Sequence, residues 1–451
     1  MGILFGTDGV RGVANDGLGP ELAFKLGRAG AYILTRRPGT KGIVVGRDTR
    51  ASGEMLEAAI VAGILSAGAD ALLLGVVPTP AVAYLVRALE AAGGVMISAS
   101  HNPAPDNGIK FFGADGYKLP DAAEEEIEGF VLGRMNGIPS PVGGDIGRAV
   151  TAHDAVRRYM NHALNAGPKE LKGLRIAVDC AHGAAYEVAP RVLESLGAEV
   201  IAAGARPDGL NINSGCGSTR PQALSELVLS SGAALGLSFD GDADRLIAVD
   251  EKGNVVDGDA IILACARYLK RRGELASNTV VVTVMSNLGL HRALAASGID
   301  ASVTRVGDRY VLEEMLRIGA CLGGEQSGHI IFLGQNTTGD GIITALNLLK
   351  VMRETGESLG ELAAEFERYP QLLKNVRVNE KERILNSPVL AEEIKRQEER
   401  LGSEGRVLVR ASGTESLIRV MVEARDPDLT LQVVNELVGV VHTLEGGEIA
   451  V

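Results

Sequence analysis

The stretch Leu235-Gly-Leu-Ser-Phe-Asp-Gly-Asp-Ala-Asp-Arg245 joins an apolar run directly to a loop of alternating aspartates. Its first half has the length and composition of a buried strand, and its second half places polar groups where that strand ends. In open α/β sheets, ligands bind at the carboxyl ends of the strands. The stretch therefore predicts an α/β fold in which this loop faces a binding site.

The same arrangement recurs along the chain. Apolar strands run into polar loops at Val45–Arg50, Ile97–Asn102 and Leu408–Thr414. Short β-branched runs, such as 42–46 and 280–284, alternate with amphipathic patterns that predict helices over 54–67 and 190–196. This alternation predicts mixed or parallel sheets that are covered on both faces. The chain has neither a G-x-G-x-x-G nor a P-loop sequence, which argues against a dinucleotide or P-loop enzyme.

The length of 451 residues predicts three or four domains. A loop rich in Gly and Pro at 133–147, a turn at 250–254 and the end of a helical pattern at Tyr369 suggest boundaries. The last part, with a strand pair at 406–410 and 418–423, is expected to be a small α+β domain. The domains are predicted to cover 1–150, 151–252, 253–368 and 369–451.

Charge and cysteine usage narrow the classes of function. The net charge is −12 and no run of Lys or Arg occurs, so no nucleic-acid partner is expected. Four widely spaced cysteines (Cys180, Cys216, Cys265 and Cys321) predict free thiols in a reducing compartment. The chain lacks a signal-peptide pattern and an apolar stretch long enough to span a bilayer. We expect a soluble, cytoplasmic protein without a membrane partner.

Asp240, Asp242 and Asp244 place three carboxylates on one loop. Like charges about 4 Å apart repel by roughly 4 kcal/mol per pair at an effective dielectric of 20, so the loop calls for a cation. Ligands that are all oxygen predict Mg²⁺ or Ca²⁺. An EF-hand is disfavoured, because Arg245 stands where its glycine belongs and a strand precedes the loop. A solvated acidic turn is the remaining alternative.

Ser98-Ala-Ser-His-Asn-Pro103 also follows a strand. Ser100 next to His101 suggests a hydrolase, but neighbours on an extended chain point to opposite faces and no G-x-S-x-G elbow is present. A phosphoserine at Ser100 would bring about −2 charge and three acceptor oxygens, which suits the cation of the aspartate loop. An ordinary capped turn is the alternative to this interpretation.

Other loops carry weaker signals. Arg410-Ala-Ser-Gly-Thr-Glu415, with Arg419 nearby, offers hydroxyls, backbone N–H groups and guanidinium forks for a phosphate. Gly323-Gly-Glu-Gln-Ser-Gly-His329 offers a mix of groups that suits a polyhydroxylated ligand, although a single histidine is more often structural. Two glycine-containing loops, 6–12 and 304–309, each add arginines.

Taken in this order, the motifs resemble those of the α-D-phosphohexomutase family over essentially the whole chain. The resemblance implies a heart-shaped, four-domain α/β architecture. Three α/β domains with mixed sheets and a smaller C-terminal α+β domain would surround a central active-site cleft. It also implies an isomerase that moves a phosphoryl group between two positions of a hexose phosphate through a phosphoserine and a bisphosphate. A hinge is expected at 369–380.

The resemblance assigns roles to individual residues. Ser100 would be the phosphorylated nucleophile, and one Mg²⁺ would be held by Ser100, Asp240, Asp242 and Asp244. Lys110 matches a lysine proposed as general acid/base, Arg245 would neutralise the transferring phosphoryl group, and His101 and Arg11 complete the catalytic set. Glu325 and Ser327 would contact sugar hydroxyls. The other substrate-binding residues implied are Arg305, Gly307, Asp308 and His329, with Arg410, Ser412, Gly413, Thr414 and Arg419 around the non-reacting phosphate.

Finer details favour the branch of the family that acts on glucosamine phosphates. They are Gln326, where phosphomannomutases more often have Met, and the stretches 6–12, 211–219 and 284–290. The implied reaction interconverts glucosamine 6-phosphate and glucosamine 1-phosphate, with glucosamine 1,6-bisphosphate as priming intermediate, and feeds UDP-N-acetylglucosamine synthesis. Ala411 and Ser416 replace prolines that are usual in the family, which predicts a less rigid phosphate loop.

Three alternatives stay open at this point. The first is a phosphomannomutase/phosphoglucomutase of broader specificity. The second is a metal-dependent phosphatase with an aspartate nucleophile in the stretch 240–242, and the third is a sugar-phosphate sensor without activity. The oligomeric state is left open between a monomer and a homodimer.

Overall fold

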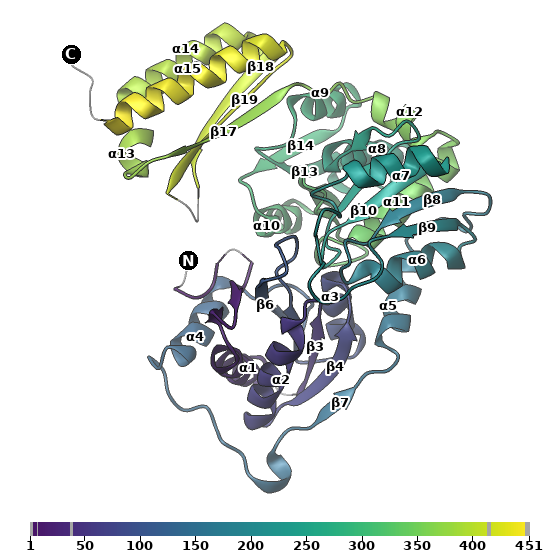
Figure 1. Cartoon of the computed structure of the whole chain (residues 1–451), viewed down its shortest axis with the longest axis vertical. Helices are drawn as coiled ribbons and strands as arrows, with labels where there is room; N and C mark the ends of the chain where they lie inside the picture. The colour runs from purple at the N-terminus through teal and green to yellow at the C-terminus, as the bar shows by residue number, and fades with distance from the viewer. Residues whose placement is uncertain (1–2, 7, 37–38, 413–415, 447–451) are drawn as a thin grey trace. The chain divides into compact units, whose positions relative to one another are not determined.

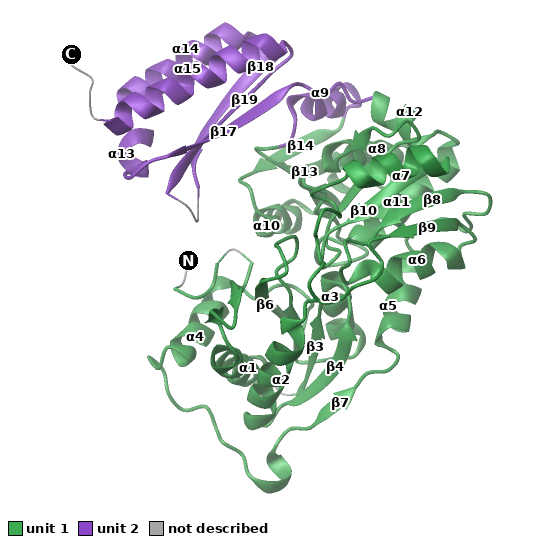
Figure 2. Ribbon diagram, viewed as in Figure 1, with its two compact units in different colours: residues 1–285, 299–364 green, residues 286–298, 365–451 purple. Residues whose placement is uncertain are grey.

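The computed structural model describes residues 3–6, 8–36, 39–412 and 416–446. The chain divides into two compact units (Figure 2). Unit 1 comprises residues 1–285 and 299–364, and unit 2 comprises residues 286–298 and 365–451. Among the described residues, unit 1 contains three sheets and unit 2 contains one (Figure 1).

The first sheet of unit 1 is mixed and has the strand order β2-β1-β6-β5-β3-β4-β7. Its strands are β1 (Val10–Ala14), β2 (Gly17–Leu18), β3 (Gly42–Arg47), β4 (Asp70–Val76), β5 (Gly93–Ile97), β6 (Asp106–Gly113) and β7 (Ala149–Thr151). Strands β3, β4, β5 and β7 run parallel, and β6 is antiparallel to β5. Four helices accompany the sheet: α1 (Pro20–Leu34), α2 (Ser52–Ser66), α3 (Thr79–Ala88) and α4 (Asp121–Val131), with a short 3₁₀ turn η1 (Gly143–Asp145).

Helices α1 and α2 meet through glycine. A Cβ on Gly63 would lie 2.2 Å from the carbonyl oxygen of Phe24, and one on Gly27 would lie 2.3 Å from that of Ile60. Any side chain at these positions would force the two helices apart. The helices therefore touch backbone to backbone, which accounts for part of the glycine excess.

The second sheet has the order β12-β11-β10-β8-β9 and the third β14-β13-β15-β16. The second consists of β8 (Arg175–Asp179), β9 (Glu199–Ala203), β10 (Leu235–Phe239), β11 (Leu246–Val249) and β12 (Val255–Val256), with helices α5 (Ala155–Leu164), α6 (Ala185–Ser195) and α7 (Gln222–Ser231). The third consists of β13 (Thr279–Thr283), β14 (Asp300–Thr304), β15 (Leu322–Gly324) and β16 (Ile330–Phe332). With it come α8 (Gly258–Arg271), η2 (Ala276–Asn278), α10 (Asp308–Ile318), α11 (Gly341–Thr355) and α12 (Leu359–Ala364).

The third sheet and its neighbours complete the mixed α/β architecture that the sequence predicts. The strand at 280–284 corresponds to β13, and the turn at 250–254 joins β11 to β12. The helix expected over 190–196 starts five residues earlier, at Ala185, so that Pro190 lies inside α6. Proline is common in the first helical turn, but Pro190 lies in the second turn of α6.

Unit 2 is an α+β unit built on an antiparallel sheet of order β17-β19-β18. Its elements are α9 (Leu288–Ala296), β17 (Gln371–Arg377), α13 (Lys381–Leu385), α14 (Pro388–Leu401), η3 (Gly402–Glu404), β18 (Gly405–Ala411), β19 (Leu417–Ala424) and α15 (Pro427–Gly446). Branched side chains of β19 and α15, including Ile418, Val420, Val433 and Leu437, form its core. The strand pair predicted at 406–410 and 418–423 is confirmed as β18 and β19.

Helix α9 belongs to unit 2, and Asn287, the residue before it, contacts Tyr369. The side-chain amide of Asn287 donates to the carbonyl oxygen of Tyr369 at 2.9 Å, and its carbonyl accepts from the N–H of Tyr369 at 3.0 Å. Tyr369 begins the segment 369–380, which continues as strand β17. Asn287 and Tyr369 both belong to unit 2, so the hinge expected in this segment stays a prediction. The chain crosses between the units at 285–286, 298–299 and 364–365.

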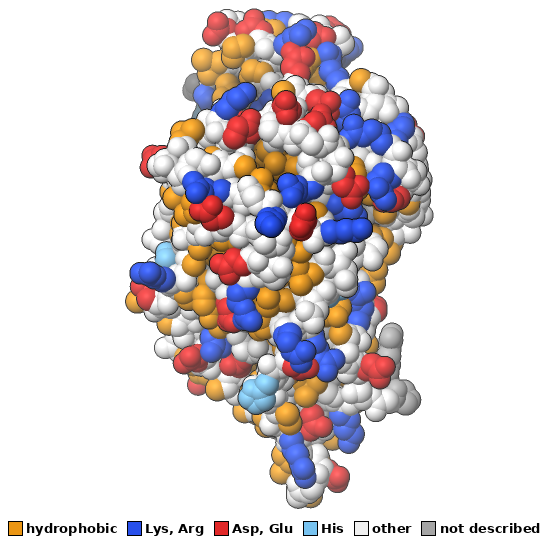
Figure 3. All heavy atoms as spheres, turned by 90° about the vertical axis from the view of Figure 1, so that its right-hand side faces the viewer, with side chains coloured by type: hydrophobic (Ala, Val, Ile, Leu, Met, Phe, Trp, Pro, Cys, Tyr) orange, Lys and Arg blue, Asp and Glu red, His pale blue; other side chains and the backbone are white. Residues whose placement is uncertain are grey.

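On the face in Figure 3, Lys and Arg side chains are interspersed with Asp and Glu. Within the described ranges, no helix is both long and apolar enough to cross a membrane.

Candidate active site

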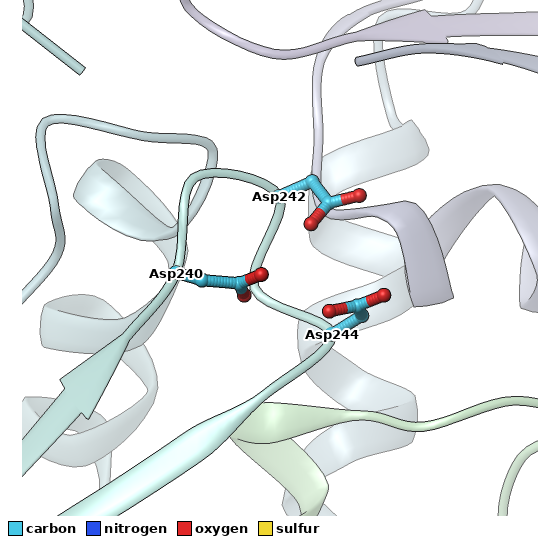
Figure 4. Close-up of side chains that lie close together, drawn as sticks. All are labelled: Asp240, Asp242 and Asp244. Atoms are coloured by element: carbon cyan, nitrogen blue, oxygen red, sulfur yellow. The ribbon is translucent and has the colours of Figure 1, made fainter. Parts of the chain in front are cut away.

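The aspartate loop lies between the antiparallel strands β10 and β11 of unit 1. The carboxylates of Asp240, Asp242 and Asp244 are buried and converge, with one oxygen of each within 4.8 Å of the others (Figure 4). One oxygen of Asp242 and one of Asp244 are buried without a hydrogen-bond partner in the described part of the chain. Burial and the two neighbouring carboxylates raise the pKa of Asp240 well above its ordinary value. This set of converging oxygens fits a hard divalent cation.

A glycine lets the loop that bears Ser100 reach the aspartates. A Cβ on Gly241 would lie 2.5 Å from the carbonyl oxygen of Ser100. The alternation of Asp with small residues therefore has two physical reasons. The aspartates supply the ligands, and the glycine between Asp240 and Asp242 leaves room for the backbone of the second loop.

Ser100 follows β5 and is buried against the aspartate loop. Its hydroxyl donates to Oδ2 of Asp240 at 2.6 Å, although 140 residues separate the two in sequence. The expectation of an extended chain at this position is wrong, because Ser100 has a φ of +51°. As a result, Nδ1 of His101 lies 3.4 Å from the Ser100 hydroxyl instead of on the opposite face. Burial and the charges of Arg245 and Arg11 lower the pKa of His101 to about 4.

Lys110 is on β6, directly opposite Met96 of β5, and is buried. Its Nζ lies 2.9 Å from Oδ2 of Asp242 and 3.0 Å from Oδ2 of Asp8. Burial alone would lower the pKa of Lys110, but these two carboxylates raise it above its ordinary value. Lys110 is therefore held as a cation. The hydroxyl of Thr79 also donates to Asp242, at 2.6 Å, and this side chain is one that the sequence did not single out.

Asp8 joins several of the predicted residues and was missed by the sequence analysis. It forms ion pairs with Arg11 and Lys118 as well as with Lys110. Burial would raise the pKa of Asp8, yet the surrounding cations hold it well below its ordinary value. Lys118 continues the network to Asp308 at 2.5 Å. A lone carboxylate in a glycine-rich loop has no pattern that could have identified it.

The predicted sugar-binding residues lie on two loops of the third sheet. The N–H of Gly307, which follows β14, donates to Oε1 of Glu325 at 3.0 Å. The hydroxyl of Ser327 is 3.5 Å from the other oxygen of Glu325. The guanidinium of Arg305 stacks on the ring of Tyr310 at 3.7 Å. The structure thus brings Gly307 and Ser327 to Glu325, and it places Arg305 on the loop that follows β14.

His329 and Arg245 both contact the aspartate loop. Nε2 of the buried His329 accepts from the N–H of Gly339 at 3.1 Å, and Nδ1 lies 3.5 Å from Oδ2 of Asp244. Burial would raise the pKa of Asp244, but the hydrogen bond from His329 and the charges of Lys110 and Arg245 lower it. The N–H of Arg245 donates to Asp240 at 3.2 Å, while its guanidinium stays partly exposed. His329 is thus placed to orient a metal ligand.

Unit 2 contains the predicted phosphate loop. Arg410 on β18 is directly opposite Arg419 on β19. Burial and the charge of Arg419 lower the pKa of Arg410, whose Nε is buried without a partner among the residues described. The carbonyl of Ser412 accepts from Lys381 at 2.9 Å. Gly413 and Thr414 lie outside the described residues. Two cations that face each other on neighbouring strands suit an anion between them.

The chain is similar to known proteins over its whole length. Four models of the phosphoglucomutase/phosphomannomutase family match, for its alpha/beta/alpha domains I, II and III and its C-terminal domain, at residues 2–135, 157–253, 257–369 and 373–440. The chain is 62% identical to a phosphoglucosamine mutase of Desulforudis audaxviator, over 99% of both chains.

Solved structures share the fold. A phosphoglucomutase/phosphomannomutase family protein of Burkholderia thailandensis has a TM-score of 0.83 at 22% identity, over 99% of this chain and 98% of the other. An N-acetylphosphoglucosamine mutase of Aspergillus fumigatus, solved with GlcNAc-6P and magnesium, has a TM-score of 0.72 at 18% identity, over 98% and 96%.

Proposed function

The chain belongs to the phosphoglucomutase/phosphomannomutase family, and from this premise we propose that it interconverts glucosamine 6-phosphate and glucosamine 1-phosphate. Full-length relatives named phosphoglucosamine mutase, at 54–62% identity, support this substrate. The reaction would feed the synthesis of UDP-N-acetylglucosamine in the cytoplasm. Four free cysteines suit such a reducing compartment.

One observation carries the proposal: the Ser100 hydroxyl meets Asp240 at 2.6 Å in a buried site where three carboxylates converge. A phosphoryl group on Ser100 would enter this cluster of oxygens only with a cation between them. We propose Mg²⁺ there, held by Asp240, Asp242, Asp244 and an oxygen of the Ser100 phosphoryl group. Mg²⁺ would neutralise charge on the phosphoryl oxygens during transfer.

The proposed transfer of the phosphoryl group from Ser100 to the sugar and back needs no further reactant. A hydroxyl of glucosamine 6-phosphate attacks the phosphorus on Ser100, a new P–O bond to the sugar forms, and the bond from phosphorus to Ser100 Oγ breaks. The sugar proton passes to a base, and Ser100 Oγ gains a proton. The resulting glucosamine 1,6-bisphosphate turns over and returns its other phosphoryl group to Ser100 in the reverse sense, which leaves glucosamine 1-phosphate.

Two residues suit the proton transfers. His101 lies 3.4 Å from the Ser100 hydroxyl, which places it for a proton transfer, although a pKa of about 4 leaves it neutral and only weakly basic at pH 7. Lys110 is kept protonated by Asp242 and Asp8, which suits a general acid or a fixed positive charge better than a base. Arg245 and Arg11 add positive charge beside the aspartates.

The remaining predicted residues would bind the substrate. Glu325 and Ser327 would contact the sugar hydroxyls, with Arg305, Gly307, Asp308 and His329 beside them. The non-reacting phosphate would bind to the loop of unit 2, through Arg410, Ser412, Gly413, Thr414 and Arg419. The directly opposite positions of Arg410 and Arg419 on β18 and β19 support this assignment. We also propose four domains, at 1–150, 151–252, 253–368 and 369–451.

The test compares kcat/KM for glucosamine 6-phosphate with the values for mannose and glucose 6-phosphates, with Mg²⁺ and a trace of bisphosphate. A preference of about a hundredfold or more, some 2.7 kcal/mol of differential transition-state binding, is expected for glucosamine. Comparable rates would identify a hexomutase of broad specificity. No turnover of any of the three would contradict a mutase.

A further inference from the structure

A fully buried arginine holds the loop that carries Ser100. Arg50 follows β3, and its Nε donates to Oδ2 of Asp48 at 2.9 Å. A guanidinium has five N–H donors. The other four reach backbone carbonyls of a single loop, those of Ser100 (3.0 Å), Asn102 (2.8 Å), Asp106 (2.9 Å) and Pro103. All five donors are therefore used, and four of them fix the course of one short segment.

Asn213 lies in the segment between β9 and α7 and contacts the same loop. Its side-chain amide donates to the carbonyls of Ser100 and Asn102, both at 2.9 Å. Asn213 itself has a φ of +58°, a conformation that asparagine tolerates better than most residues. Its own N–H donates to the carbonyl of Ala181 at 2.9 Å, which anchors it. The carbonyls of Ser100 and Asn102 thus each accept from both Arg50 and Asn213.

The backbone of Ser100 needs such support. A φ of +51° costs a residue with a Cβ roughly 1–2 kcal/mol, so it persists only where surrounding contacts impose it. The N–H of Ser100 donates to the hydroxyl of Ser98 at 2.9 Å, which in turn donates to Asp48 at 2.6 Å. Asp48 also holds Arg50, so the hydrogen bonds close a ring around the Ser100 backbone.

We propose that Arg50 and Asn213 form a clamp that positions Ser100 for phosphoryl transfer. Both are positioning residues, since their side chains donate to the backbone carbonyl of the nucleophile and not to its Oγ. The clamp keeps Ser100 in its left-handed conformation and so keeps its Oγ on Asp240. This inference rests on the proposed function. A displacement of the nucleophile by about 1 Å costs on the order of a hundredfold in rate, while the substrate contacts stay as they are.

Asn213 provides the sharper test, because it is only half-buried. Asn213→Gly removes the amide and still accepts the positive φ. Asn213→Asp keeps the shape but turns an oxygen toward two carbonyls that need donors. Ser214→Ala, at the exposed neighbouring position, is the matched control. Arg50→Lys provides a second variant, because a lysine at position 50 can still pair with Asp48 but cannot supply five donors.

With glucosamine 6-phosphate, kcat is expected to fall about 10- to 100-fold in Asn213→Gly and further in Asn213→Asp, with KM within about threefold of the parent. The control should behave as the parent. Amide hydrogen exchange in peptides that cover 99–106 should be faster in both Asn213 variants, while exchange in unit 2 stays the same.

Three results would overturn the clamp: unchanged kcat in both Asn213 variants, a rise in KM at constant kcat, or unchanged exchange over 99–106. If the parent itself shows no mutase turnover, the proposed function fails separately. The clamp is then judged by hydrogen exchange and by mass-spectrometric phosphorylation of Ser100 with glucose 1,6-bisphosphate, which does not depend on glucosamine specificity. Equal hydrogen exchange over 99–106, or equal phosphorylation of Ser100, in Asn213→Gly and Ser214→Ala would refute the clamp.

Discussion

Arg410 and Arg419 form a directly opposed pair on the antiparallel strands β18 and β19 of unit 2. Like charges directly opposite on neighbouring strands destabilise a sheet. Burial adds to the cost, and together with Arg419 it lowers the pKa of Arg410. Two like charges that face each other and would bind an anion bidentately are typical of a binding site rather than of a structural element.

Inorganic phosphate is therefore expected to stabilise unit 2 through this pair. The apparent Tm of the parent should rise by a few degrees in phosphate compared with sodium chloride of equal ionic strength. Arg410→Gln should lose most of this rise and increase KM for glucosamine 6-phosphate by about tenfold or more. Arg406→Gln is the matched control, since Arg406 on the same strand pairs with Glu423. An equal phosphate response in parent and Arg410→Gln would contradict the site.

Ser100→Ala should abolish mutase turnover, with a loss of roughly a thousandfold or more, because no other hydroxyl replaces the nucleophile. Mass spectrometry of the parent incubated with glucose 1,6-bisphosphate should find one phosphoryl group on the peptide that contains Ser100, and none in the variant. Release of inorganic phosphate from glucosamine 6-phosphate by Ser100→Ala at the parent rate would instead favour an aspartate nucleophile and a phosphatase.

Asp240→Asn should separate metal binding from stability. Burial and the neighbouring carboxylates raise the pKa of Asp240, so ionised Asp240 weakens the folded state once the pH rises above the ordinary carboxyl range. In EDTA at pH 8, Asp240→Asn should melt at a higher temperature than the parent. It should also lose the Mg²⁺-dependent rise in Tm and the activity.

Asp242→Asn is the matched comparison. Asp242 is the partner of buried Lys110 and accepts from Thr79. Its neutralisation should therefore lower Tm in EDTA, because a buried cation loses a partner. Equal melting temperatures for the two variants would argue against the electrostatic account of the aspartate loop.

Glu124 on α4 predicts a pH dependence of stability. Burial raises its pKa to about 7, with Arg309 opposing this shift and Asp121 adding to it. Between about pH 4.5 and 7, the folded state therefore binds more protons at this site than the unfolded state. The free energy of unfolding falls as the pH rises through that window.

Glu124→Gln should remove this contribution. Compared with the parent, the variant should gain up to about 1 kcal/mol in stability between pH 5 and pH 8, after allowance for the partial exposure of Glu124. Urea unfolding at both pH values checks this. Glu125→Gln controls for the loss of one negative charge on the same helix. A constant difference between Glu124→Gln and the parent at the two pH values would show that Glu124 does not titrate in this window.

The sequence is most informative where the ligands of a site are neighbours in the chain. Asp240, Asp242 and Asp244 lie on one loop after one buried strand, so their spacing alone predicts that their carboxylates meet. It is less informative for Ser100. The motif around Ser100 predicts a functional serine, but it predicts neither the left-handed backbone nor the contact with His101. Backbone conformation at a single residue depends on contacts from distant segments.

The residues that sequence reasoning missed act through partners far along the chain. Asp8 contacts Lys118 across 110 residues, Thr79 contacts Asp242 across 163, and Asn213 contacts Ser100 across 113. Asp8 and Asn213 lie outside the helices and strands, and Thr79 is the first residue of α3. Each is a single polar residue that belongs to no periodic or spaced pattern. Asn287 at the start of α9 likewise contacts Tyr369, 82 residues away in the sequence.

By itself, the sequence determined the mixed α/β architecture, the strand-to-loop transitions and the chemical groups each loop presents, because these follow from local hydrophobic pattern and residue type. Only the tertiary structure decided which loops meet. It put Ser100 on Asp240, gave Lys110 two carboxylate partners, and surrounded the Ser100 backbone with donors from Arg50 and Asn213. These contacts depend on how three sheets pack in unit 1, and packing adds the energies of many weak contacts between segments that no local pattern connects.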